Sequence, residues 1–165
     1  MSLKNSNASK KTHKFLLNKL KDRRTLKIYK KFENELAINK NFIVAVSGGP
    51  DSLALSFLSK IYSIKKSLDA KYFIVDHGLR KNSTTEAKNV QKKLKNFSIK
   101  LNILTWRGFK PKKNIQSIAR EKRYKLLCDR AKKYRIDLRS RSVTTVSVTY
   151  CRECWRAGPQ SRGHP

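Results

Sequence analysis

The sequence predicts an α/β protein built on a doubly wound parallel sheet. Three short apolar runs, at residues 42–46, 71–75 and about 99–106, have the length and β-branched content of buried strands. Each run is followed by a longer segment in which apolar residues recur at the spacing of a helix. A strand–helix order that occurs three times is typical of a parallel sheet with helices packed on its faces.

The turn after the first predicted strand is the most informative stretch of the chain. It reads Ser47, Gly48, Gly49, Pro50, Asp51, Ser52. A strand, a tight turn and a helix place unpaired backbone N–H groups at a helix N-terminus, where the helix dipole also favours negative charge. We therefore expect this turn to bind an anionic group such as a phosphate. The turn alone leaves open an ordinary βα connection with a polar cap.

Each residue type in this turn suits a phosphate site. Gly48 and Gly49 allow a positive φ and the close approach of a phosphate to the backbone. Asp51 is a candidate cation ligand, and Ser52 is a candidate hydroxyl donor. Pro50 is tolerated because the first helical turn does not need its missing N–H group. The helix that follows is predicted to face the sheet with Ala54, Phe57, Leu58 and Ile61.

Polar residues from Asp76 to Arg80 end the second predicted strand, which places them at the edge of the ligand crevice of an open α/β sheet. Ser83 and Glu86 have the spacing of a capping box, with Ser83 as the cap of the next helix. Asn114 is expected to cap a long third helix. The residues predicted to face inward from that helix are Ile115, Ile118, Ala119, Leu126, Leu127 and Ala131.

The chain is strongly basic, with a formal net charge of +29 over 165 residues. This favours a polyanionic partner such as nucleic acid. Residues 1–11 are polar and are predicted to be a disordered lead, and residues 12–39 to form one or two basic amphipathic helices. Their charged face either contacts RNA or is simply solvated. No apolar run is long enough for a membrane span or a signal peptide, so we expect a cytoplasmic protein without a membrane partner.

Three segments together resemble the tRNA(Ile)-lysidine synthetases. The Ser47–Ser52 turn matches the Ser-Gly-Gly-x-Asp-Ser signature of the PP-loop ATP pyrophosphatases, which cleave ATP to AMP and pyrophosphate. Residues 75–80, Val-Asp-His-Gly-Leu-Arg, and residues 114–124, which begin Asn-Ile-Gln-Ser-Ile-Ala-Arg, are more specific to the lysidine synthetases. The resemblance covers residues 42–137 and implies the PP-loop, adenine nucleotide alpha hydrolase-like fold.

The resemblance also implies an activity. It indicates an ATP-dependent carbon–nitrogen ligase that joins free lysine to carbon-2 of the wobble cytidine of an isoleucine tRNA. It places the ATP phosphates on Ser47–Ser52 and Mg²⁺ on Asp51, and it assigns catalytic roles to Asp51 and Arg120. Three alternatives stay open. They are another PP-loop tRNA-modifying enzyme such as a 2-thiocytidine synthetase, a nucleotide- or RNA-binding module without turnover, and a translated fragment without function.

Residues 138–165 do not continue this pattern. No lysine follows Lys133, and Arg, Ser, Thr, Gly and Pro become frequent, as in sequence read in another frame. We therefore divide the chain into basic N-terminal helices at 1–40, a partial PP-loop domain at 41–137 and an unmatched tail, in which one short strand could form at 143–148. Cys151 and Cys154 form a single C-x-x-C in this tail and are given no role. With the family's later segments not recognisable, we expect little or no ligase activity from the chain as written.

Overall fold

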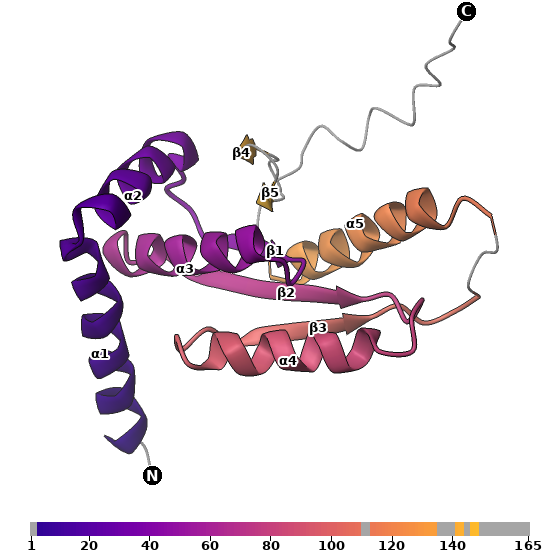
Figure 1. The fold of residues 1–165 in the computed structure, drawn as a ribbon, viewed down its shortest axis with the longest axis horizontal. Helices are drawn as coiled ribbons and strands as arrows, with labels where there is room; N and C mark the ends of the chain where they lie inside the picture. The colour runs from indigo at the N-terminus through magenta and orange to yellow at the C-terminus, as the bar shows by residue number, and fades with distance from the viewer. Residues whose placement is uncertain (1–2, 110–112, 135–140, 144–145, 149–165) are drawn as a thin grey trace, which may run out of the picture.

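A three-stranded parallel sheet with the order β1-β2-β3 forms the centre of the protein (Figure 1). The computed structural model describes residues 3–109, 113–134, 141–143 and 146–148, and the side chains of residues 11–109 and 113–134. The elements are α1 (Leu3–Asn18), η1 (Lys19–Lys21), α2 (Arg23–Leu36), β1 (Phe42–Val46), α3 (Pro50–Lys65), β2 (Ala70–Asp76), α4 (Ser83–Lys95), β3 (Leu101–Thr105), α5 (Ile115–Lys133), β4 (Arg141–Val143) and β5 (Val146–Val148).

The three strands end at the same edge of the sheet. Val46, the last residue of β1, pairs with Ile74, and Asp76, the last residue of β2, pairs with Thr105 at the end of β3. The three strands lie where the sequence predicts them, although β3 is shorter than the predicted 99–106. Their carboxyl ends therefore meet on one side of the molecule, where open α/β sheets bind ligands.

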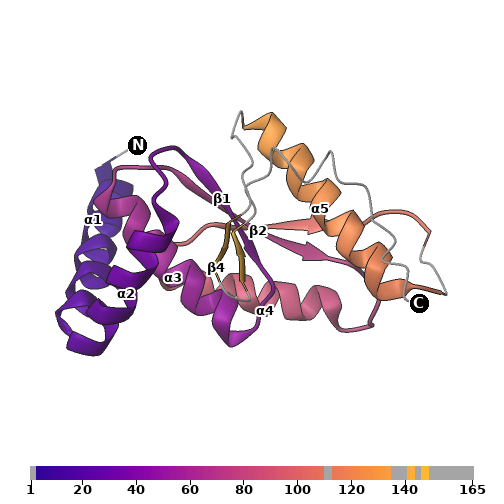
Figure 2. The ribbon, with the colours of Figure 1, turned by 90° about the horizontal axis from the view of Figure 1, so that it is seen from above.

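Helices cover both faces of the sheet, as the doubly wound prediction requires. On one face, Phe42, Val44 and Val46 of β1 pack into a large core with residues from α1 to α4. On the opposite face, Ile43 and Phe73 pack against Leu127 and Ala131 of α5. Figure 2 shows α5 on the opposite side of the strands from α3 and α4. The α/β fold predicted from the sequence is confirmed.

The two N-terminal helices belong to the larger core. Leu16 of α1 and Tyr29, Phe32 and Leu36 of α2 are buried in it. Asp22 caps α2, because its Oδ2 accepts a hydrogen bond from the Thr25 backbone N–H at 2.7 Å. The prediction of a disordered lead over residues 1–11 is wrong, since α1 begins at Leu3. A helix of 16 residues can propagate through this polar stretch from the packed turn around Leu16.

Of the four residues that α3 was predicted to turn toward the sheet, Ile61 is buried in the core and Phe57 and Leu58 pack against it, so Ala54 is the one placed wrongly. Ala54 is exposed, and the buried face carries serines, at Ser52, Ser56, Ser59 and Ser63. The Ser56 hydroxyl donates to the Ser52 carbonyl oxygen at 2.7 Å, and the Ser59 hydroxyl to the Ser56 carbonyl oxygen at 3.1 Å. Because these hydroxyls are satisfied within the helix, small polar side chains can be buried against the sheet without an unpaired donor.

Two predicted helix caps are also corrected. Ser83 is the first residue of α4, the N-cap is Asn82, and the Ser83 hydroxyl donates to Asp76 Oδ1 at 2.6 Å instead of to the helix backbone. Asn114 occupies the N-cap of α5 in a left-handed conformation, with φ of 52°, but makes no side-chain cap. Ile115, predicted to face inward, is 41% exposed. In each case a long-range contact or the loop geometry prevails over the local pattern.

Beyond residue 134 the structure describes only a short antiparallel hairpin. Its strands are β4 and β5, which pair Ser142 with Ser147 in a sheet separate from the main one. The single strand predicted over 143–148 is thus two shorter ones, and β5 lies close to β1. Cys151 and Cys154 lie outside the described residues. Within the described part of the chain, no helix combines the length and the apolar character needed to cross a membrane.

Candidate nucleotide-binding site

A pocket of about 570 Å³ opens at the carboxyl ends of β1 and β2. Ser47 and Gly48 of the turn after β1 form one part of its wall, and residues 76–80 after β2 form another. The first turns of α4 and Arg123 of α5 complete the lining. The two segments that the sequence placed beside one crevice therefore do share a pocket. Its volume lies in the range of sites that bind small molecules of nucleotide size.

Gly48 shapes the turn through its backbone conformation. Its φ is +91°, and a Cβ atom at this position would lie 3.0 Å from Val90 Cγ2 of α4. Gly48 is thus needed both for the left-handed turn and for the close approach of α4. Gly49 does not use this freedom, because its φ is −72°, and it serves as the N-cap of α3. A Cβ at Gly49 would meet only Ser47 Oγ, at 4.0 Å.

Ser52 stabilises the turn through its hydroxyl group. The Ser52 Oγ accepts a hydrogen bond from the Gly48 N–H at 3.0 Å and donates to the Gly49 carbonyl oxygen at 2.9 Å. Ser52 is 3% exposed, so its hydroxyl is committed to the turn in this structure. The backbone N–H groups of Asp51 and Ser52 lie in the first turn of α3, where no carbonyl of the same helix can accept from them. The Asp51 side chain is exposed beside them.

Asp76 organises the other wall of the pocket. Its Oδ1 accepts hydrogen bonds from the Gly78 N–H at 2.9 Å and from the Ser83 hydroxyl at 2.6 Å. Its Oδ2 accepts a third bond from the Thr84 hydroxyl at 2.6 Å. Burial alone would raise the pKa of this carboxyl, but these hydrogen bonds, with His77 nearby, outweigh burial and hold the pKa below its ordinary value. Asp76 thus ties the loop after β2 to the start of α4.

Cationic side chains gather around the pocket. Arg80, Lys93 and Arg123 line it together with two carboxylates, those of Asp76 and Glu86. The excess of positive charge and the backbone donors of the turn favour a bound anion. Within the described residues, no three His, Cys, Asp or Glu side chains gather where they could hold a metal ion.

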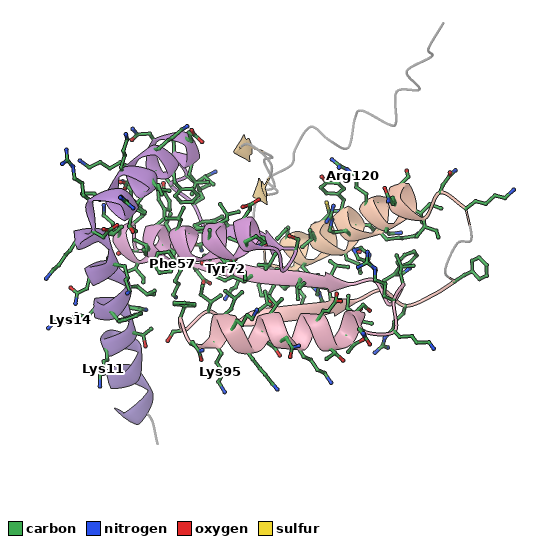
Figure 3. The ribbon with its side chains drawn as sticks, viewed as in Figure 1. Lys11, Lys14, Phe57, Tyr72, Lys95 and Arg120 are labelled. Atoms are coloured by element: carbon green, nitrogen blue, oxygen red, sulfur yellow. The ribbon has the colours of Figure 1, made fainter. Side chains whose placement is uncertain are left out.

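The arginine chosen from the sequence is not the one that lines the pocket. Arg120 is exposed, projects from α5 away from the sheet and lies over the ring of Tyr124, 5.4 Å from its centroid (Figure 3). Arg123, one turn further along, lies 5.9 Å from the same ring and also lines the pocket. Sequence reasoning missed Arg123 as a candidate. The signal was present, since Arg123 lies within the segment 114–124 that was singled out as specific.

A family comparison agrees with this geometry. Residues 18–138 match the model of the PP-loop domain, which takes in α2, the sheet and α5. The chain belongs to the PP-loop family. Membership implies that this domain binds ATP, and it accounts for a glycine turn, a helix N-terminus and a basic pocket meeting at the carboxyl edge of the sheet.

The most similar relatives share one name. Over 100 residues the chain is 38% identical to the tRNA(Ile)-lysidine synthase of Bradyrhizobium diazoefficiens, covering 59% of this chain and 28% of that protein. It is 43% identical over 96 residues to the Bartonella quintana protein of that name, and the match covers 57% of this chain and 20% of that protein. The Lactobacillus gasseri protein of that name is 39% identical over 100 residues, and the match covers 60% of this chain and 23% of that protein. The chain thus spans between a fifth and somewhat over a quarter of these relatives.

Proposed function

We propose that this PP-loop domain serves ATP-dependent lysidine formation on an isoleucine tRNA. The observation that carries the proposal is the pocket that Ser47 and Gly48, at the start of the turn, share with residues 76–80, together with relatives named for this activity. In the reaction, the oxygen on carbon-2 of the wobble cytidine attacks the α-phosphorus of ATP. An oxygen–phosphorus bond forms and pyrophosphate leaves. The amine of free lysine then attacks carbon-2, loses a proton and displaces AMP.

The turn after β1 is the candidate pyrophosphate site. The N–H groups of Asp51 and Ser52 would donate to phosphate oxygens, and the N-terminal end of α3 adds its dipole. The Gly48–Ser52 hydrogen bonds fix this geometry before the substrate arrives, so little reorganisation is needed on binding. Gly49 lacks a side chain at the point where the phosphates would approach the backbone.

Asp51 is the candidate ligand for Mg²⁺. Magnesium commonly uses one or two carboxylates together with substrate phosphates and water, so a single exposed carboxylate beside the turn fits such a site. When bound, the metal would offset the phosphate charge. Arg120 is the candidate group for stabilising the adenylated intermediate, by the similarity of its segment to the family. Arg123 and Arg80, which line the pocket, are candidates for holding the ATP phosphates.

Nucleotide binding is tested by calorimetry with MgATP. Asp51→Ala should lower the affinity for MgATP by at least tenfold without changing the fold, because Asp51 is exposed. Asp129→Ala, which removes another exposed carboxylate from α5, is the matched control and should bind as the wild type does. If the wild type, Asp51→Ala and Asp129→Ala bind MgATP with equal affinity, Asp51 does not take part in nucleotide binding.

The adenylation step is tested separately. Because little or no complete ligation is expected of this chain, the sensitive measurement is the first half-reaction: ATP, Mg²⁺ and isoleucine tRNA should give a low level of adenylated tRNA, and ATP–pyrophosphate exchange should depend on the tRNA. Arg120→Ala should abolish exchange while leaving ATP affinity unchanged, whereas Arg123→Ala should weaken ATP binding. Binding of MgATP without any exchange would favour a nucleotide- and RNA-binding module over an enzyme. Transfer of sulfur instead of lysine would favour the 2-thiocytidine synthetase alternative.

A further inference from the structure

We propose that Phe109 and Arg107, in the loop after β3, form a stacking platform for an unpaired RNA base beside the nucleotide pocket. The inference rests on the proposed function, since it takes an RNA to be the substrate. It adds a base-contacting site that lies outside the turn after β1 and outside the segments matched to the family motifs. Its parts are the exposure of Phe109, the way the loop is anchored and the charge around it.

Phe109 is unusually exposed for an aromatic residue. Its side chain is 84% exposed, whereas the next most exposed large hydrophobic residue of the described chain, Ile28, is 59% exposed. Single exposed apolar residues are common on protein surfaces, so exposure by itself decides nothing. What distinguishes Phe109 is where the loop holds it and which residues surround it.

The base of this loop is fixed against the pocket wall. Trp106 is 8% exposed, and its backbone N–H donates to the Asp76 carbonyl oxygen at 2.9 Å. Its ring meets the ring of His77 edge-on, with the centroids 6.2 Å apart. His77 itself lines the pocket. Phe109 follows three residues later, a stretch of chain that spans at most about 11 Å.

Gly108 precedes Phe109, and its φ of +124° is strained for any residue with a side chain. The loop lies at the end of the molecule where β2 and β3 end (Figure 1). Phe109 is therefore presented at the same edge of the sheet as the pocket, on a segment whose first residue is anchored. A substrate whose reacting base enters the pocket would carry its neighbouring nucleotides past this loop.

The charge of this region selects the partner. Between Glu86 and Glu121 the sequence contains lysines and arginines but no acidic residue. In the sequence, Arg107 lies two residues before Phe109 and Lys113 four residues after it, and both are exposed. An isolated ring between cations is a poor site for an apolar protein surface, which needs a contiguous patch. It suits a nucleic acid loop, whose unpaired bases stack on aromatic side chains while lysine and arginine bind the phosphates.

The test compares two RNAs and four variants by fluorescence anisotropy. One RNA is a stem–loop with an unpaired loop, and the other is a blunt duplex of equal length. Phe109→Ala should weaken stem–loop binding by about 5- to 150-fold, the range for loss of one stacked base. Phe109→Trp should restore binding, since a larger ring stacks equally well. Arg107→Ala should weaken binding and also reduce its salt dependence, whereas Phe109→Ala should leave the salt dependence unchanged.

Phe15→Ala is the matched control. Phe15 of α1 is 48% exposed and has the Lys19 ammonium 5.2 Å from its ring centroid, so it is another exposed ring beside a cation, but on a different element. It should leave stem–loop binding within twofold of the wild type. Failure of the wild type to bind either RNA would overturn the RNA substrate and the platform together. Wild-type binding that Phe109→Ala does not weaken, or weakens equally for the duplex, would overturn the platform alone.

Discussion

Gly48 and Gly49 are adjacent in the sequence but meet different structural demands. Gly48 has a positive φ, and a Cβ atom there would lie 3.0 Å from Val90 Cγ2, close enough that Val90 would have to shift. Gly49 has an ordinary φ and open space around it. The sequence indicated a glycine turn but could not divide the two roles, because the division depends on how α4 packs against the turn.

Alanine substitutions should separate these roles. Gly48→Ala should lower the free energy of unfolding by about 1–3 kcal/mol, from the left-handed backbone and the contact with Val90. Gly49→Ala should change it by less than about 0.5 kcal/mol, because the lost N-cap preference and the reduced freedom of the unfolded chain offset each other. Urea unfolding of both variants measures the difference. Equal destabilisation would show that the turn is not held by Gly48.

Asp76 should make the stability of the protein depend on pH in the acid range. Its pKa in the folded state is below the ordinary value of 3.8, so its contribution is complete above that value and is lost as the pH falls through the folded-state pKa. Asp76→Asn should cost about 2–3 kcal/mol at pH 7, where the charged hydrogen bonds to Gly78, Ser83 and Thr84 are weakened. The difference in unfolding free energy between the wild type and Asp76→Asn should become smaller below about pH 4.

Urea unfolding of both proteins at pH 7 and pH 3 checks this expectation. Glu86→Gln, which changes an exposed carboxylate at the start of the same helix, is the control for the substitution itself. If the difference in unfolding free energy between the wild type and Asp76→Asn is the same at pH 7 and pH 3, the hydrogen bonds to Asp76 do not depend on its charge.

At the scale of elements, hydrophobic periodicity located the strands and helices well and their buried faces less well. The strand β1 lies where an unbroken apolar run predicted it, because a strand buried on both faces leaves a signal that needs no partner to be recognised. On α3 the pattern placed Ile61, Phe57 and Leu58 correctly, but it put Ala54 on the buried face and did not anticipate the serines that are buried there. Serine is ordinarily a surface residue, and only the bond from its hydroxyl to a carbonyl of the same helix allows this burial.

Leucine substitutions on α3 should distinguish the two faces. Ala54→Leu should change the free energy of unfolding by less than about 0.5 kcal/mol, because the side chain at 54 is exposed. Ser56→Leu should cost about 1–3 kcal/mol, because Ser56 is fully buried and a larger side chain must displace its neighbours. Thermal or urea unfolding measures both. The reverse order would restore the face predicted from the sequence.

At the scale of the whole molecule, the location of the pocket was predictable, but the set of residues lining it was only partly so. The turn after β1 and the end of β2 had to meet, because parallel strands that are neighbours end at one edge. The choice between Arg120 and Arg123 depends on the rotation of α5 on its face of the sheet, which a helical pattern with many partly buried residues does not determine. The division of the chain at residues 40 and 137 stays a prediction.

The charge of the molecule is spread over both ends. Lys11 and Lys14 are exposed on α1, at the end of the sheet opposite the carboxyl ends of the strands (Figures 1 and 3). Arg80 and Lys93 line the pocket at the other end. An RNA that reaches from one end to the other would therefore meet cations along its backbone, and these contacts do not depend on base sequence.

RNA binding by this chain should accordingly depend strongly on salt and select weakly among tRNAs. If six to ten phosphates are neutralised, affinity should fall by about 10³- to 10⁵-fold between 50 and 200 mM salt. Replacing Lys11 and Lys14 by Ala should reduce the salt dependence equally for isoleucine tRNA and for bulk tRNA, since both removed contacts are to phosphates. Selectivity would rest on a few groups near the pocket, Phe109 among them, so we expect a preference below about tenfold, or 1.4 kcal/mol. Competition between the two tRNAs at fixed salt measures it. A larger preference would mean that base-specific contacts extend well beyond the pocket edge.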